Sequence, residues 1–190
     1  MGESSLQAVS VRVCAPGATR QADREALLAF VAEVTGADPA VTATGRRCPH
    51  CGGTDHGRPW AAADGVTVGV SLSRTDGALA LAVGPHPIGV DVERVRRVSA
   101  APLDASSPGE RVRYGDDPLA LTACWSATEA VLKRDGRGLR VDPATVDVDL
   151  DAGTAFLDGV AHRVLVRRLD DDLVLAVAAD GVPVDVEDRR

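Results

Sequence analysis

Alternating apolar and polar residues along the chain predict a protein built from short strands and two helices. Strands are expected where such alternation, or a brief apolar run, lies between turn residues. Seven segments fit this pattern: 8–13, 66–72, 78–83, 88–93, 145–150, 160–169 and 173–178. Apolar residues at helical spacing predict one helix over 22–34 and a clearer one over 119–134, and Gly36 and Gly136 follow them as stop signals.

Three other stretches have no regular pattern. Residues 37–65 hold many Gly, Pro and Cys residues, so we expect a structured loop there. Residues 94–117 are rich in Arg, Ser and Pro, which predicts a long mobile loop or a short helix. The polar tail over 182–190 is expected to be frayed. None of the three is expected to contribute a strand.

The order of the elements predicts an α+β fold. Strand, helix and strands are followed by helix and strands, as if one α+β unit were repeated. We expect a single domain over 1–190 with two pseudo-symmetric halves, about 1–93 and about 94–190. No convincing sequence identity relates the two halves.

Composition and charge narrow the class of protein. The chain is 45% hydrophobic and 26% charged, which suits a globular domain with a sizeable core. Its net charge of -7 argues against a general nucleic-acid or membrane binder. No apolar run approaches the roughly 18 residues of a membrane span, and the N-terminal residues do not resemble a signal peptide. We therefore expect a cytoplasmic monomer with reduced cysteines.

Asp91 and Glu93 are the first candidates for chemistry. In a strand over 88–93 they project from one face, and Val90 and Val92 project from the other. Two carboxylates on one face repel each other, and a bound cation relieves that repulsion. Mg²⁺ in particular is held by one or two carboxylates together with substrate phosphates. A solvated strand end with acidic residues explains the same pattern.

A second candidate is one face of the helix over 119–134. Trp125, Glu129, Leu132 and Lys133 share this face at spacings of three and four. Glu129 could complete a metal site or act as a general base, while Lys133 could neutralise a phosphate. An ordinary amphipathic helix, with Trp125 and Leu132 in the core and a surface Glu–Lys pair, explains the spacing equally well.

Together the two segments resemble the Sfp-type 4'-phosphopantetheinyl transferase family. Its usual motifs are G-[IV]-D-[IV]-E and W-[ST]-x-K-E-[AS]-x-x-K, the latter followed by Gly-Leu. Upstream lie G-[KR]-P and N-[LI]-S-H-[ST]. The corresponding segments of this chain are 89–93, 125–133, 138–139, 57–59 and 71–75. The matching order makes the resemblance specific for the middle of the chain.

The resemblance implies an enzyme that moves the 4'-phosphopantetheine arm of coenzyme A onto a serine of an apo acyl or peptidyl carrier protein, releasing 3',5'-ADP. Such carriers serve fatty acid, polyketide or nonribosomal peptide biosynthesis. It also implies an active site between the two halves, with Mg²⁺ held by Asp91, Glu93 and Glu129. Glu129 is the favoured base in this comparison, and Lys133 contacts phosphate.

The resemblance further implies a coenzyme A-binding set, namely Arg58, Pro59, Ser73, Arg74 and Lys133. Arg74 stands where the family has histidine, and arginine binds phosphate well enough to replace it. Thr128 stands where the family has lysine, which removes one positive charge from the phosphate neighbourhood. Thr128 therefore leaves open a non-catalytic member of the same fold that binds coenzyme A or a carrier protein.

The segment 94–113 is a candidate docking site for an acidic carrier protein. Its charged residues are Arg94, Arg96, Arg97, Arg111 and Arg113 against Asp104 and Glu110. The segment lies where the family docks its carriers. A solvated loop accounts for the same composition.

Cys48, Cys51 and His56 resemble part of a zinc knuckle. A closed tetrahedral site needs four ligands, and these residues supply three, with His50 or a distant residue as a strained fourth. Because no second C-x-x-C is present, we favour a reduced loop with a Gly-Gly turn over structural zinc. A small zinc-stapled interaction module is the alternative from another class, and metal content distinguishes it from a transferase.

Overall fold

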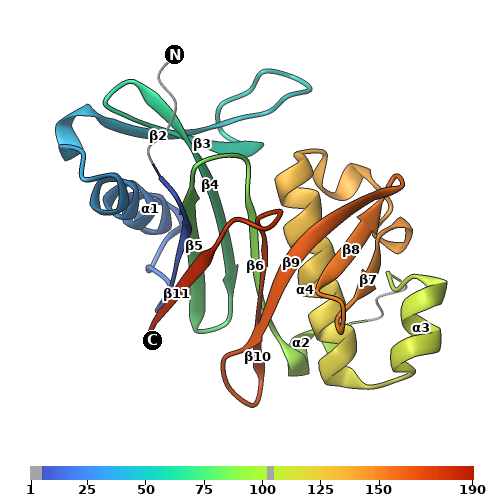
Figure 1. The fold of residues 1–190 in the computed structure, drawn as a ribbon. Coiled ribbons are helices and arrows are strands. Elements are labelled where there is room, and N and C mark those ends of the chain that lie inside the picture. The colour runs from blue at the N-terminus through green and yellow to red at the C-terminus, as the bar shows by residue number, and fades with distance from the viewer. Residues whose placement is uncertain (1–5, 102–104) are drawn as a thin grey trace.

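The computed structural model describes residues 6–101 and 105–190 and contains two sheets lying side by side (Figure 1). The first sheet has six strands in the order β11-β1-β5-β4-β3-β2. Their bounds are β1 (Val9–Cys14), β2 (Thr42–Arg47), β3 (Arg58–Ala63), β4 (Val66–Thr75), β5 (Ala78–Gly84) and β11 (Val184–Arg189). Neighbouring strands are antiparallel except β1 and β11, which pair in parallel.

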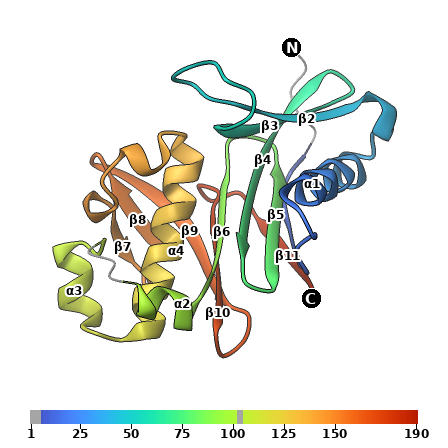
Figure 2. The same ribbon diagram turned by 180° about the vertical axis from the view of Figure 1, so that it is seen from behind.

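Helix α1 (Arg20–Thr35) covers one face of the first sheet (Figure 2). The Thr19 side chain caps its start by accepting from the Ala22 amide, and Gly36 ends it in the left-handed conformation, with φ of 69°. Leu27, Phe30 and Val31 pack from the helix onto the valines and leucines of β4 and β5. The helix predicted over 22–34 is thus confirmed and is slightly longer than its apolar pattern.

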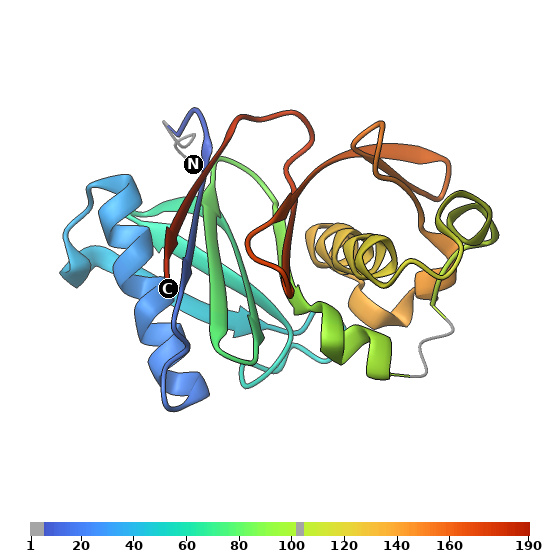
Figure 3. The same cartoon turned by 90° about the horizontal axis from the view of Figure 1, so that it is seen from below.

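The second sheet has five strands in the order β6-β10-β9-β8-β7 and curves around helix α4 (Pro118–Asp135) (Figure 3). Its strands are β6 (Gly89–Arg94), β7 (Asp147–Asp149), β8 (Thr154–Leu157), β9 (Val160–Arg168) and β10 (Leu173–Ala178). Asp117 caps α4 through its side chain, and Gly136 ends it with φ of 90°.

The remaining elements are short. They are the α-helices α2 (Val95–Ala100) and α3 (Pro108–Tyr114) and the 3-10 turns η1 (Pro39–Val41), η2 (Gly138–Arg140) and η3 (Pro143–Thr145). No helix in the described part of the chain is long and apolar enough to cross a membrane. The prediction of an α+β fold is confirmed.

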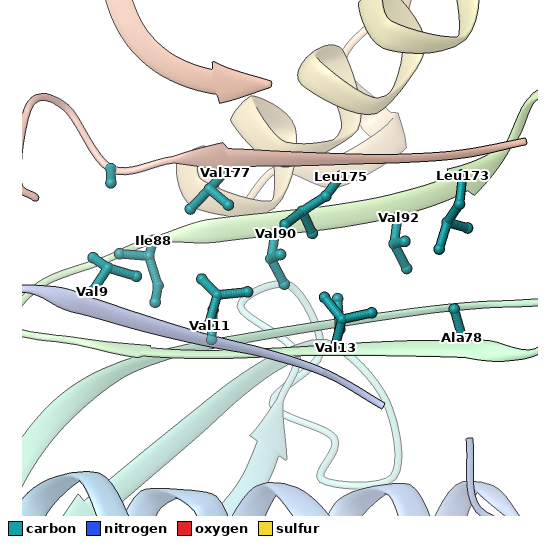
Figure 4. Close-up of a cluster of buried hydrophobic side chains, with 13 residues drawn as sticks. Val9, Val11, Val13, Ala78, Ile88, Val90, Val92, Leu173, Leu175 and Val177 are labelled. Carbon is teal, nitrogen blue, oxygen red and sulfur yellow. The ribbon is translucent and has the colours of Figure 1, made fainter. Parts of the chain in front are cut away.

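A core of small aliphatic side chains joins the two sheets (Figure 4). Val90 and Val92 of β6 lie in it together with Val11 and Val13 of β1 and Leu175 of β10, all fully buried. Each such side chain contributes about 1.5–3 kcal/mol by its burial. Because strand side chains alternate, this core fixes the direction in which the intervening residues of β6 point.

Two of the three segments without a regular pattern were predicted wrongly. Residues 37–65 contain strands β2 and β3, and the tail over 182–190 contains β11. These strands have few large apolar residues because β2 and β11 are sheet edges, and their stability comes from backbone ladders to β3 and β1. The third segment, 94–117, holds α2 and α3, which agrees with the predicted short helix.

The two sheets exchange strands across the predicted boundary near residue 93. β6 precedes that boundary for most of its length but pairs with β10, and the last strand, β11, returns to pair with β1. Each sheet therefore contains a strand from the other side of the boundary, and the two parts of the chain are interlocked. β8 is a further strand without a clear sequence signal, since only four residues form it.

Candidate functional site

Asp91 lies at the junction of β6, β4 and α4. Its Oδ1 atom accepts hydrogen bonds from Ser73 Oγ at 2.7 Å and from Lys133 Nζ at 2.6 Å. The side chain is only 3% exposed, and its Oδ2 atom is buried without a hydrogen-bond partner among the described residues. A buried carboxylate oxygen without a partner is costly, and a bound ligand that contacts this atom would remove that cost.

Gly89 explains how α4 comes so close to β6. A Cβ atom at position 89 would lie 1.8 Å from the carbonyl oxygen of Ala130, so only glycine fits here. The close approach places Lys133 directly beside Asp91. The glycine of the G-V-D-V-E segment therefore has a packing role that supports the carboxylates after it.

Glu93 lies on the same face of β6 as Asp91, and the predicted alternation is confirmed. Both carboxylate oxygens accept from Arg97 Nη1, at 2.7 and 2.6 Å, and Oε2 also accepts from Thr75 Oγ1 at 3.2 Å. The side chain is buried, whereas that of Arg97 is 58% exposed. Water screens the exposed partner, so the ion pair is a weak one that other ligands of Glu93 can replace.

Glu129 lies one turn before Lys133 on α4. Burial raises the pKa of this carboxyl above its ordinary value, the charge of Lys133 opposes the rise, and the charges of Asp91 and Glu93 add to it. The charges of Asp91, Glu93 and Lys133 thus all act on the Glu129 carboxyl. A raised pKa suits a group that accepts a proton near neutral pH.

A cavity of about 470 Å³ opens between the first sheet and the C-terminal end of α4. Its lining includes six basic side chains, those of Arg46, His50, Arg58, Lys133, Arg137 and Arg140. The described lining residues include no carboxylate, and apolar groups such as Val70 and Leu72 complete the wall. A cavity with this balance of charge fits a polyanion that also has an apolar part.

Two of the cavity's arginines are held by backbone carbonyls. Arg58 Nη2 donates to the carbonyl of Arg134 at 2.9 Å, near the end of α4, and Arg46 Nη1 donates to the carbonyl of Gly57 at 2.9 Å. Burial lowers the pKa of Arg46, as expected for a cation removed from water without a counter-charge. Pro59 also lines the cavity, beside Arg58.

Arg74 and Thr128 lie away from this cavity. Arg74 is on the opposite face of β4 from Ser73, and its Nη1 atom binds Asp23 of α1 at 2.7 Å. Thr128 is 2% exposed and lines a separate cavity of about 260 Å³ together with Trp125. Of the predicted coenzyme A-binding set, Arg58, Pro59 and Lys133 line the large cavity, and Ser73 joins it through its contact with Asp91 and Lys133.

Four of the five arginines of 94–113 lie close to acidic groups of the chain itself. Arg96 binds Asp172, and Arg113 binds Asp147 at 2.7 Å. Arg94 lies near Asp170 and Asp172, and Arg97 is bound to Glu93 as described above. Asp104 is outside the described residues, and Glu110 is buried in the capping box that begins α3. This segment is therefore less basic as a surface than its sequence indicates.

Arg46, Arg137 and Arg140 were missed as lining residues. Arg46 follows a Gly in a stretch taken for a loop, and Arg137 and Arg140 follow the end of α4. All three arginines lie close to a glycine at the end of a helix or strand. Many surface turns have the same pattern, so it does not predict a binding site. Only the tertiary approach of β2 to the end of α4 brings them together.

Fold and site define a protein with a cationic cavity beside a buried carboxylate cluster. Residues 87–178 match the model of the 4'-phosphopantetheinyl transferase superfamily. The match includes Asp91, Glu93, Glu129 and Lys133 and spans just under half of the chain. It does not include β2, β3 and β4, which supply Arg46, Arg58 and Ser73. No curated protein matches the chain.

Proposed function

We propose that this chain is a Mg²⁺-dependent 4'-phosphopantetheinyl transferase of the Sfp type. It would transfer the phosphopantetheine arm of coenzyme A to a serine of an apo acyl or peptidyl carrier protein and act as a cytoplasmic monomer. The observation that carries the proposal is the free, buried Oδ2 atom of Asp91, placed next to Lys133 at the edge of a cationic cavity. The superfamily match over β6 and α4 supports it.

Coenzyme A suits the cavity by its charge and by its apolar part. Its phosphate groups need cations, which Arg46, Arg58 and Lys133 provide, and its adenine needs an apolar wall, which Val70 and Leu72 provide. Pro59 and Ser73 belong to the same binding set. We leave Arg74 out of it, because its guanidinium is bound to Asp23 on the other face of the strand.

The oxygen chemistry of the three carboxylates suits Mg²⁺, but their oxygens do not form a group within 4.8 Å of one another, so the side chains would have to move closer together to share one ion. Asp91, Glu93 and Glu129 are hard oxygen ligands, and Asp91 Oδ2 has no competing hydrogen bond among the described residues. Mg²⁺ bound there would supply positive charge to the pyrophosphate as negative charge develops on it. Lys133, whose ammonium already donates to Asp91, Ser73 and the Val90 carbonyl, would contribute its positive charge from the side of α4.

The proposed reaction is a single displacement at phosphorus. The carrier serine Oγ forms a bond to the phosphorus that bears the pantetheine arm, and the bond from that phosphorus to the bridging pyrophosphate oxygen breaks. The bridging oxygen leaves with 3',5'-ADP, and Glu129 accepts the serine proton. Its raised pKa makes it a better proton acceptor than an exposed glutamate.

The site draws on both sheets, which agrees with a proposed active site between two related α+β units. Ser73 comes from the first sheet, Asp91 from the second, and Glu129 from the helix that the second sheet surrounds. Docking of an acidic carrier on 94–113 remains part of the proposal. Because several arginines of this segment already form ion pairs within the chain, few of their charges would be available to bind an acidic carrier.

A binding measurement and a labelling measurement together test the proposal. Calorimetry should give Mg²⁺-dependent binding of coenzyme A, and a fluorescent coenzyme A should label an apo carrier on its serine. Binding without labelling of any carrier would support the non-catalytic alternative instead. Thr128 itself lines the separate cavity of about 260 Å³ and is not part of the cavity proposed for coenzyme A.

A further inference from the structure

The segment between β2 and β3 brings three metal-ligating side chains together. One ligand atom from each of Cys48, Cys51 and His56 lies within 4.8 Å of the others, and Cys51 Sγ is 3.3 Å from His56 Nε2. We propose that these three side chains bind one zinc ion, separate from the Mg²⁺ site, and that the ion braces the wall of the cationic cavity. The fourth tetrahedral position would be held by water, because Cys51 and His56 are exposed.

The imidazole of His56 is oriented as a metal ligand would be. Its Nδ1 atom is 2.7 Å from Asp55 Oδ1, which fixes the proton on Nδ1 and leaves the lone pair of Nε2 directed at the thiols. A carboxylate behind a metal-binding histidine is a common arrangement, since it sets both the tautomer and the ring direction. The neighbouring residue in sequence thus has a specific supporting role.

The backbone around the two thiols forms a tight turn. The Gly52 amide donates to the Cys48 carbonyl at 2.9 Å, and the Cys48 amide donates to the Gly53 carbonyl at 2.9 Å. The Gly53 amide also donates to Cys51 Sγ at 3.4 Å. These hydrogen bonds hold Cys48 and Cys51 in one tight turn, with their side chains close to that of His56.

Two glycines leave the room that this turn requires. A Cβ atom on Gly53 would lie 2.9 Å from His56 Cε1 and 3.2 Å from Cys51 Sγ. A Cβ atom on Gly57 would lie 2.5 Å from the Cys48 backbone, and Gly57 has φ of 95°. The glycines therefore keep the two thiols and the imidazole close to each other.

The chemistry of this cluster differs from that of the carboxylate site. Two thiolates and a neutral imidazole prefer zinc, and they cancel its charge, whereas oxygen ligands prefer Mg²⁺. The other two cysteines lie elsewhere: Cys14 is in β1, and burial raises the pKa of Cys124 in α4 to about 12. These two thiols are outside the cluster and serve as controls.

The position of the cluster indicates its role. It bridges the ends of β2 and β3 where Arg47 lies opposite Arg58, and Cys48, Pro49 and His50 line the cavity themselves. Figures 1 and 2 show this connection beside the C-terminal end of α4. A bound ion would hold Arg46 and Arg58 in place without contacting the anionic ligand.

The test is the metal content of the full chain purified without added metal or chelator. We expect about one zinc per chain, falling below about a tenth in Cys48→Ser and Cys51→Ser, while Cys14→Ser keeps the full amount. Replacement by Co²⁺ should give the thiolate charge-transfer band in the parent and lose it when both Cys48→Ser and Cys51→Ser are present. Addition of a chelator should lower the Tm and raise amide exchange in 48–57.

Three results would overturn the proposal. They are no zinc uptake by the reduced parent, equal zinc in Cys48→Ser, or a Cys48–Cys51 disulfide in the purified chain. The measurement uses no coenzyme A and no carrier, so it stands whether or not transferase activity is found. If a cysteine variant fails to fold, cobalt titration of the parent alone still decides the question.

Discussion

Lys133 Nζ lies 2.6 Å from Asp91 Oδ1, and this contact joins helix α4 to strand β6. The same ammonium donates to Ser73 Oγ and to the carbonyl of Val90, each at 3.1 Å. Lys133 is the only lysine among the 21 lysine and arginine residues of the chain. Three acceptors around one point suit the three donors of an ammonium better than a planar guanidinium.

Replacement of Lys133 should therefore destabilise the fold even when charge is kept. We expect Lys133→Arg and Lys133→Met each to lose about 1–3 kcal/mol of unfolding free energy, because a buried carboxylate loses its fitted partner. Urea unfolding measures the loss. Arg168→Gln, which breaks an exposed pair with Asp171, should cost less than about 0.5 kcal/mol. A Lys133→Arg variant as stable as the parent would show that the three acceptors around position 133 do not require an ammonium group.

Glu129 should make stability fall as pH rises. Because its folded pKa is raised, the folded state holds a proton that the unfolded state has already released. Without Mg²⁺, Glu129→Gln should match the parent below the ordinary glutamate pKa and become the more stable of the two as pH rises through the folded pKa. Thermal unfolding with a chelator at several pH values measures this. Glu25→Gln on the exposed side of α1 is the control, and parallel curves for Glu129→Gln and parent would refute the assignment.

Gly89 should not tolerate a side chain. Gly89→Ala would place a Cβ atom 1.8 Å from the Ala130 carbonyl oxygen, so that α4 must move away from β6. We expect a loss of about 1–3 kcal/mol or more, together with weaker coenzyme A binding. Gly181→Ala meets no atom within 4 Å and should show only its backbone strain, about 1 kcal/mol. Equal effects of the two substitutions would mean that the helix–strand contact is not tight.

Arg58 and Arg74 should differ in their effect on nucleotide binding. We expect Arg58→Gln to weaken binding of 3',5'-ADP by about 10- to 100-fold, since a charged hydrogen bond to phosphate is lost. Arg74→Gln should lower stability through the loss of its bond to Asp23 but leave the Kd unchanged. Calorimetry on both variants measures the difference. A larger loss of affinity in Arg74→Gln would restore that arginine to the phosphate site.

The strongest sequence patterns correctly predicted the two elements that carry the candidate site. The alternation over 88–93 and the helical spacing over 119–134 gave the directions of Asp91, Glu93 and the α4 residues, because buried apolar neighbours fix those elements locally. Edge strands such as β2 and β11 have no such local signal. The partner of β2 follows a long connection, and the partner of β11 is β1, at the opposite end of the chain.

The cavity was only partly predictable for the same reason. Arg58 and Lys133 were found through the motifs that contain them, whereas Arg46 and Arg140 reach the cavity through the packing of β2 and η2. For Arg74 the motif predicted the correct strand but not the partner of the side chain. Its guanidinium is bound to Asp23 of α1. Side-chain partners from distant elements decide such cases.

We propose that the three carboxylates and the cationic cavity together perform phosphopantetheine transfer, and the intact mass of an apo carrier protein after reaction is the test of this activity. Several apo carriers would be incubated with the full chain, coenzyme A and Mg²⁺, and in parallel with Glu129→Gln and with Arg74→Gln. We expect one added phosphopantetheine arm with the parent and with Arg74→Gln, and a loss of transfer by about 100-fold or more with Glu129→Gln. Unmodified carriers in every reaction, with coenzyme A bound by the parent, would contradict it.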